Sequence, residues 1–176
     1  MNATLFCNAT GNPVPTIRWT KGGSVIMGNS KNELSADQKH LTVINVSRND
    51  GGEYLCEAEN SLGNNTSTGI RLDVQYRPEI TFHPNAVIRP VGSSVILYCN
   101  VTANPEPTIS WTKIGFSGQL HNNSRISYSE SHKKLTMANV NMRDSGKYEC
   151  AATNDVGKDV SRAALVDVTC NYDVSP

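Results

Sequence analysis

The stretch Asp144-Ser145-Gly146-Lys147-Tyr148-Glu149-Cys150 decides the fold of this chain, because it occurs twice. Its earlier copy is Asp50-Gly51-Gly52-Glu53-Tyr54-Leu55-Cys56, so both copies read D-x-G-x-Y-x-C. Tyr and Cys two residues apart lie on the same face of a strand, which must be the buried face if the Cys is to bridge to a second sheet. Asp and Gly suit the preceding turn, whose backbone can accept a hydrogen bond from the Tyr hydroxyl.

The rest of the chain repeats in step with this motif. In each half a cysteine precedes a tryptophan by 12 residues, namely Cys7 before Trp19 and Cys99 before Trp111. Six positions of the first half, within residues 41–56, recur 94 residues later. A repeat of this length has the size of a domain rather than of a solenoid unit, so the 176 residues divide into two domains.

The pattern Cys…Trp…D-x-G-x-Y-x-C, present twice, resembles two tandem immunoglobulin domains. The phrase N-P-x-P-x-I-x-W, at residues 12–19 and 104–111, is similar to the intermediate (I-set, C2-like) class of cell-adhesion molecules and hemicentin-type matrix proteins. The resemblance implies an all-β fold of two Greek-key β-sandwiches with two antiparallel sheets each. It implies the disulfides Cys7–Cys56 and Cys99–Cys150, with Trp19 and Trp111 in the two cores. It also implies two tyrosine corners, one formed by Asp50 and Tyr54 and the other by Asp144 and Tyr148.

The cysteines and glycosylation signals bear on the compartment. Each implied disulfide would close a loop of roughly 50 residues, worth about 4 kcal/mol in the chain-entropy treatment. Reduced thiols in a cytosolic protein are the alternative, and a zinc site is disfavoured because no C-x-x-C pair occurs. Paired cysteines, together with the N-x-S/T glycosylation acceptors, favour an extracellular or cell-surface glycoprotein. The acceptors are Asn2, Asn8, Asn45, Asn64, Asn65, Asn100 and Asn122.

The expected boundaries are domain 1 at residues 1–76, domain 2 at 77–168 and a tail at 169–176. Only six residues precede Cys7, so we expect domain 1 to lack the A strand of the family, which exposes a sheet edge and lowers its stability. Domain 2 has every strand, the first one split at residues 83–85. Residues 1–4 do not begin a signal peptide, so we expect a piece of a longer secreted protein. Cys170 is the odd cysteine, and the sequence does not choose its partner.

Composition and motifs argue against catalysis. The 16 basic and 16 acidic residues give zero net charge, which disfavours nucleic acid and anionic membranes as partners. No apolar run is long enough to span a membrane. No G-x-S-x-G, H-E-x-x-H or phosphate-loop pattern occurs, so no catalytic residue, metal or cofactor is predicted. The histidines are scattered at His40, His83, His121 and His132, and are interpreted as surface residues.

Binding is then the expected activity. Immunoglobulin domains commonly recognise proteins through end loops or through the outer face of strands C, F and G, called here the C-F-G face. Strand alternation places these residues on it: Arg18, Leu55, Glu57, Arg71, Ala151 and Leu165. Acceptors Asn8, Asn45 and Asn100 fall on the opposite sheet, which is expected to leave the C-F-G face freer for protein contact.

The resemblance implies a non-catalytic recognition module of a multidomain cell-adhesion protein, whose parent is secreted or membrane-anchored. Its partner would be a protein, with self-binding as one form. A receptor tyrosine kinase ectodomain that holds a soluble ligand is the first alternative. A spacer in an extracellular-matrix protein or a muscle scaffold of titin type is the other, and the sequons and paired cysteines weigh against the scaffold.

Overall fold

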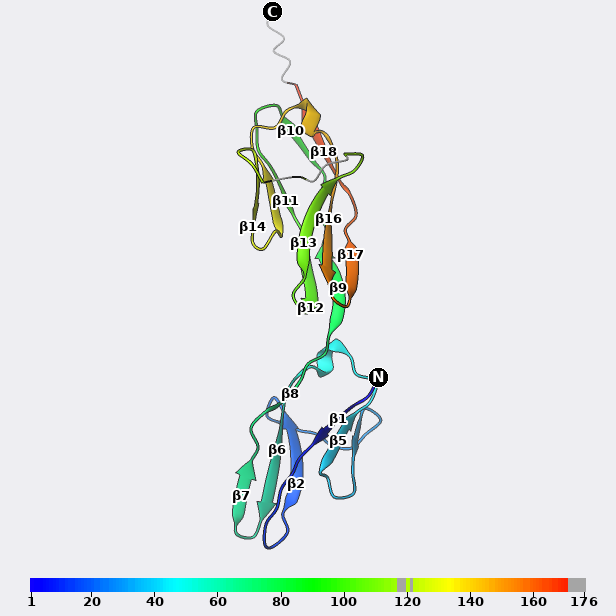
Figure 1. Cartoon of the computed structure of the whole chain (residues 1–176), viewed down its shortest axis with the longest axis vertical. Coiled ribbons are helices and arrows are strands. Elements are labelled where there is room, and N and C mark those ends of the chain that lie inside the picture. The colour runs from blue at the N-terminus through cyan, green and yellow to red at the C-terminus, as the bar shows by residue number, and fades with distance from the viewer. Residues whose placement is uncertain (117–119, 121, 171–176) are drawn as a thin grey trace, which may run out of the picture. The chain divides into compact units, whose positions relative to one another are not determined.

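The computed structural model describes residues 1–116, 120 and 122–170. The chain divides into unit 1, Met1–Val74, and unit 2, Gln75–Pro176. In the described residues the regular structure is β-strand, apart from two short 3-10 turns, η1 (Arg48–Asp50) and η2 (Met142–Asp144) (Figure 1). Each turn ends at the Asp of a D-x-G-x-Y-x-C motif, directly before the longest strand of its unit.

Unit 1 is a sandwich of two sheets. One sheet has the order β1-β5-β4, formed by Ala3–Phe6, His40–Val43 and Asn32–Leu34. The other has the order β3-β2-β6-β7, with β8 also paired to β6, and is formed by Ser24–Val25, Thr16–Lys21, Gly52–Asn60, Gly63–Thr66 and Ile70–Leu72. In family terms β1, β5 and β4 are strands B, E and D, while β2, β6 and β7 with β8 are strands C, F and G.

Unit 2 has the same two sheets and a further strand pair (Figure 1). Its B-E-D sheet has the order β11-β15-β14, formed by Val95–Tyr98, Lys134–Met137 and Ile126–Ser129. Its C-F-G sheet has the order β10-β18-β16-β13, with β17 on β16, and is formed by Val87–Pro90, Ala164–Thr169, Gly146–Asn154, Thr108–Lys113 and Gly157–Val160. The extra pair is β9 (Tyr76–Phe82) on β12 (Asn100–Asn104).

The first strand of unit 2 is split, and its second half pairs differently from the rest. β9 runs antiparallel to β12, but β10 pairs with β18 in parallel. The predicted fold of antiparallel sandwiches is confirmed, with β10 on β18 as a parallel pair. The parallel pairing arises because residues 83–86 form no strand, and the chain crosses there from β12 to β18. Both halves then run in the same direction along different sheets.

The last strand of each unit is also divided, into β7 and β8 in unit 1 and into β17 and β18 in unit 2. Ser67 Oγ accepts a hydrogen bond from Cys56 N at 3.0 Å, and Ser161 Oγ accepts one from Cys150 N at 3.0 Å. The side chain thus replaces a backbone carbonyl of the ladder, which separates β7 from β8 and β17 from β18.

Both cores lie between the sheets around a disulfide. Cys7–Cys56 joins the sheets of unit 1 with a Cα–Cα distance of 6.2 Å, and Cys99–Cys150 joins those of unit 2 at 6.5 Å. Trp19 and Trp111 are 1% and 3% exposed beside them. Eight buried residues form the cluster of unit 1, and 16 form the cluster of unit 2. Since each large buried side chain contributes about 1.5–3 kcal/mol, unit 2 has the larger hydrophobic stabilisation.

Candidate functional site: the C-F-G faces

The turn before strand F fixes which side chains face outward in each unit. Tyr54 Oη donates to Asp50 O, and Tyr148 Oη donates to Asp144 O, both at 2.7 Å. The motif glycines have φ of 130° at Gly52 and 151° at Gly146, a region in which a Cβ is strained. With Tyr and Cys held inward, the residues between them must face solvent.

The motif Asp of each unit is held by a cation from the start of strand D. Arg125 donates to both carboxylate oxygens of Asp144, at 3.0 and 3.2 Å. In unit 1 the equivalent residue, 94 positions earlier, is Lys31, which donates to Asp50 Oδ2 at 2.7 Å. Partial burial raises the pKa of Asp50, but hydrogen bonds from Lys31 and Ser47 outweigh it and hold this pKa below 3.8.

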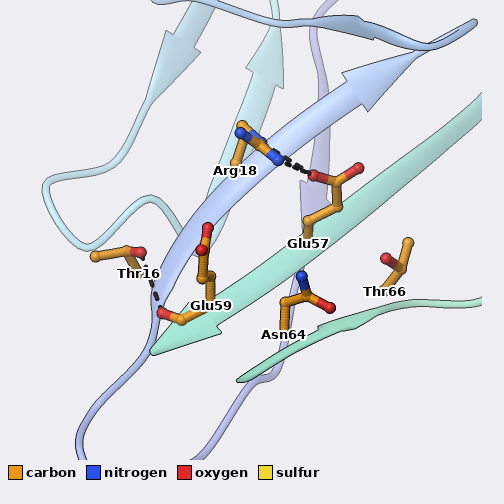
Figure 2. Close-up of a pocket in the computed structure, with 6 residues that line it drawn as sticks. All are labelled: Thr16, Arg18, Glu57, Glu59, Asn64 and Thr66. Atoms are coloured by element: carbon orange, nitrogen blue, oxygen red, sulfur yellow. Dashed lines mark hydrogen bonds and ion pairs between the residues drawn. The ribbon is translucent and has the colours of Figure 1, made fainter. Parts of the chain in front are cut away.

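The outward side chains of β2, β6 and β7 surround a polar hollow on the C-F-G face of unit 1 (Figure 2). In the strand register Arg18 lies opposite Glu57, and Glu57 lies opposite Thr66. Directly opposed residues share a face, so three strands contribute to one site. The hollow has a volume of about 370 Å³ and is lined by Thr16, Arg18, Glu57, Glu59, Asn64 and Thr66.

An ion pair crosses this hollow. Arg18 Nε and Nη2 donate to Glu57 Oε2 at 2.9 and 2.5 Å. The hydrogen bond with Glu57, followed by the charge of Glu57, raises the pKa of Arg18. The Arg18 side chain is 56% exposed, so the pair adds little to stability. Glu59 brings a second carboxylate to the same face. The hollow is therefore a polar site with donors and acceptors side by side.

The other two residues predicted for this face lie further along β6 and β8. Leu55 is half-buried opposite Thr20, which is itself only 5% exposed. Arg71 is exposed and lies opposite Glu53. Leu55 therefore presents little apolar area, and the C-F-G face of unit 1 is charged along most of its length.

The C-F-G face of unit 2 carries more exposed apolar side chains, placed among charged ones. Leu165 is 49% exposed, and Ala151 lies in the register between Ser110 and Val160. Val160 is 41% exposed. Ile88 is 64% exposed on β10, beside Asp167 of β18. Alternation predicted Ala151 and Leu165, but Ile88 and Val160 were missed, and they double the apolar side chains on this face.

All seven predicted glycan acceptors are exposed. Asn2 Oδ1 accepts a hydrogen bond from Asn45 N at 2.9 Å, which ties two of them together. Asn8 and Asn100 follow the first cysteine of each unit, away from the C-F-G face. Asn64 lies on that face, opposite Glu59, so the C-F-G face of unit 1 also carries a glycan acceptor. The register of β7 could not be read from the local sequence.

In the residues that the structure describes, no group of three His, Cys, Asp or Glu side chains could hold a metal ion. The described part of the chain also contains no helix long and apolar enough to cross a membrane. His40 stacks on Phe6, His83 accepts from Arg162 N, and His132 lies beside Tyr128. His121 lies outside the described residues. Cys170 is exposed and unpaired, with Sγ 3.7 Å from Met142 Sδ.

Two sandwiches, each with a disulfide between its sheets, a tryptophan on it and a Tyr hydroxyl bonded to the preceding turn, define a tandem immunoglobulin-domain protein. The immunoglobulin I-set domain family matches residues 78–166, and a second immunoglobulin domain family matches residues 1–60. The chain therefore belongs to the immunoglobulin superfamily, with an I-set domain in unit 2.

The relatives include a cell adhesion molecule. Neural cell adhesion molecule 1 of Mus musculus is 34% identical, over 90% of this chain and 15% of that protein. Roundabout homolog 1 of Mus musculus is 33% identical, over 93% and 10%. The Homo sapiens peroxidasin homolog is 36% identical, over 92% and 11%. The chain thus spans between a tenth and a fifth of the length of these curated relatives.

Solved tandem immunoglobulin structures share the fold. The titin pair A168–A169 has a TM-score of 0.68 at 26% identity, covering 96% of this chain and 90% of that one. The tandem immunoglobulin repeats of Dlar have a TM-score of 0.51 at 30% identity, covering 97% and 90%. Since these matches come from proteins of different kinds, they identify the fold and not the partner.

Proposed function

We propose that this chain is a non-catalytic extracellular recognition module of a multidomain adhesion protein, and that it binds a protein partner through the C-F-G face of unit 2. One observation carries the proposal, namely the exposed apolar side chains of Ile88, Val160 and Leu165, which lie on the same outer face of the sheet as Ala151. Protein interfaces place apolar side chains at the centre and charged ones at the rim. Kinship with neural cell adhesion molecule 1 and its relatives supports the extracellular role.

Charged residues of both signs lie beside these apolar side chains. Lys147 lies opposite Leu165, Asp167 lies beside Ile88, and Lys158 is exposed on β17. A rim with both signs suits a complementary rim, including that of a second copy of the same face. Self-association through this face is therefore the first form of binding to test.

The test uses substitutions taken from the equivalent positions of unit 1. Leu165 and Ala151 match Arg71 and Glu57 of unit 1, so Leu165→Arg and Ala151→Glu place residues that the same scaffold already carries. The control is Ile96→Arg, a change of the same kind at a side chain that is 44% exposed on the opposite sheet of unit 2. All variants carry Cys170→Ser to prevent disulfide-linked dimers.

Sedimentation equilibrium of the secreted chain is expected to show reversible dimers. Leu165→Arg should raise their dissociation constant more than about tenfold, and Ile96→Arg should leave it unchanged. If the chain is monomeric, the same variants are scored for binding to cells that display immunoglobulin-domain adhesion proteins. Binding that is absent, or equally sensitive to Leu165→Arg and Ile96→Arg, would overturn the proposed face and favour the matrix-spacer alternative.

A further inference from the structure

The two neighbouring glycan acceptors on β7 point in opposite directions. Asn64 lies opposite Glu59 on the outer face, and Asn65 lies opposite Ala58 on the inner side. Figure 2 shows Asn64 and Thr66 along the strand that borders the Arg18–Glu57 pair. Alternation along β7 therefore makes the two acceptors different sites, although they are adjacent in sequence.

We propose that Asn64 is N-glycosylated and that the sugars nearest the protein lie in the polar hollow on the C-F-G face of unit 1. This face would then present carbohydrate, and protein contact would be left to the C-F-G face of unit 2. The inference rests on the extracellular placement in the proposed function, since N-glycans are added in the secretory pathway.

The chemistry of the hollow suits a sugar. Its lining offers the Arg18 guanidinium, the carboxylates of Glu57 and Glu59, and the hydroxyls of Thr16 and Thr66. Sugar hydroxyls both donate and accept, so they can pair with each of these groups, and hydrogen bonds to charged partners are the stronger ones. No large apolar side chain lines the hollow, so it lacks the anchor that a protein hot spot requires. Its volume of about 370 Å³ falls in the range of small-ligand sites.

Asn65 does not line this hollow. Its Oδ1 accepts a hydrogen bond from Thr66 N at 2.9 Å, and its side chain lines a separate hollow beside Cys7 and Cys56. The serine of its acceptor sequence, Ser67, is held by Cys56 N. A sugar on Asn65 would therefore leave the Arg18–Glu57 pair uncovered. The assignment to Asn64 follows from the strand register and not from the acceptor sequence.

The experiment compares sugars within one molecule. The full chain is secreted with an added signal peptide from cells that retain high-mannose glycans, and glycopeptide mass spectrometry gives the occupancy of each acceptor. The native protein is then treated with endoglycosidase H, and release from Asn64 is followed against release from Asn122, which is exposed in a loop of unit 2. Asn65→Gln removes the neighbouring acceptor.

The expected result is an occupied Asn64 whose glycan is released about tenfold more slowly than that of Asn122, as one or two net hydrogen bonds would give. The double variant Arg18→Ala with Glu59→Ala should abolish the difference. The control Glu33→Ala removes an exposed carboxylate from the other sheet and should preserve it. An empty Asn64 among occupied acceptors, equal release rates, or a double variant without effect would each overturn the inference. If all seven acceptors were empty, the extracellular placement itself would be wrong.

Discussion

The C-F-G faces of the two units differ, although strands C, F and G are paired in the same way in both sheets. Several positions that face inward keep their residue across the repeat: Leu41 and Leu135, Tyr54 and Tyr148, Ala58 and Ala152. Several positions that face outward change: Glu57 becomes Ala151, Thr66 becomes Val160, and Arg71 becomes Leu165. Strand F alone shows both behaviours at alternating residues. The fold is thus specified by one side of each strand, which leaves the other side free to differ in binding.

The two units also differ in how their cores are closed. In unit 2, β9 covers one end of the sandwich, with Ile80 only 6% exposed and its backbone N donating to Asp159 Oδ2 at 2.8 Å. The described residues of unit 1 contain no counterpart to β9. There Ala58 is half-buried, where Ala152 of unit 2 is fully buried, and a hollow of about 300 Å³ reaches the disulfide. Unit 1 should therefore unfold first.

Two matched core variants test this difference in stability between the units, and their expected effect is the largest. Leu41 and Leu135 are both fully buried and occupy equivalent positions. Denaturant unfolding of the whole chain should show two transitions, and Leu41→Ala should lower the first by about 2–5 kcal/mol while Leu135→Ala lowers the second by a similar amount. Circular dichroism and tryptophan fluorescence follow both transitions, since each unit contains one Trp. A single transition shifted equally by either variant would contradict the comparison.

A second, smaller effect concerns the tyrosine corner of unit 2 at high pH. Burial, and then the charge of Asp144, raise the pKa of Tyr148 to about 12. Because the folded-state pKa lies above the ordinary value of 10.0, the neutral hydroxyl stabilises the fold below pH 10. This stabilisation is lost as the pH rises toward 12, and amounts to about 2–3 kcal/mol. Unfolding measured across this window should show the loss in unit 2, and Tyr148→Phe should remove it. An unchanged pH dependence in Tyr148→Phe would mean that another group is responsible.

Much of the fold, but less of the site, could be predicted from the sequence. Cys, Trp and the D-x-G-x-Y-x-C motif identify the sheets because each of these residues is needed at a fixed inward position. Alternation also gave the outward residues Arg18 and Leu165. It could not give Ile88, because lateral pairing of β10 with β18 depends on where the chain crosses between sheets. The position of Asn64 opposite Glu59 could not be given for the same reason, since local alternation does not fix register with a neighbouring strand.

The pair of Lys31 with Asp50 yields the smallest predicted effect. A Lys neutralises a carboxylate as an Arg does, but as a point charge without the planar fork of a guanidinium. The Lys31–Asp50 pair is a single contact of 2.7 Å, while Arg125 holds Asp144 with two nitrogens. Since the pKa of Asp50 is held below 3.8, the pair stabilises unit 1 above that pH, and this contribution disappears as the pH falls through the lowered pKa.

The variants Lys31→Met and Lys31→Arg separate the charge from its geometry. Lys31→Met should destabilise the first unfolding transition by about 0.5–1 kcal/mol at neutral pH and by nearly nothing at the lowest pH, where Asp50 is protonated. Lys31→Arg should keep or slightly increase stability, because a guanidinium can form the two-nitrogen contact seen in unit 2. Urea unfolding at several pH values measures both variants. If Lys31→Met were equally destabilising at every pH, packing of the lysine stem would be the cause, and the two cations would have different roles in the two units.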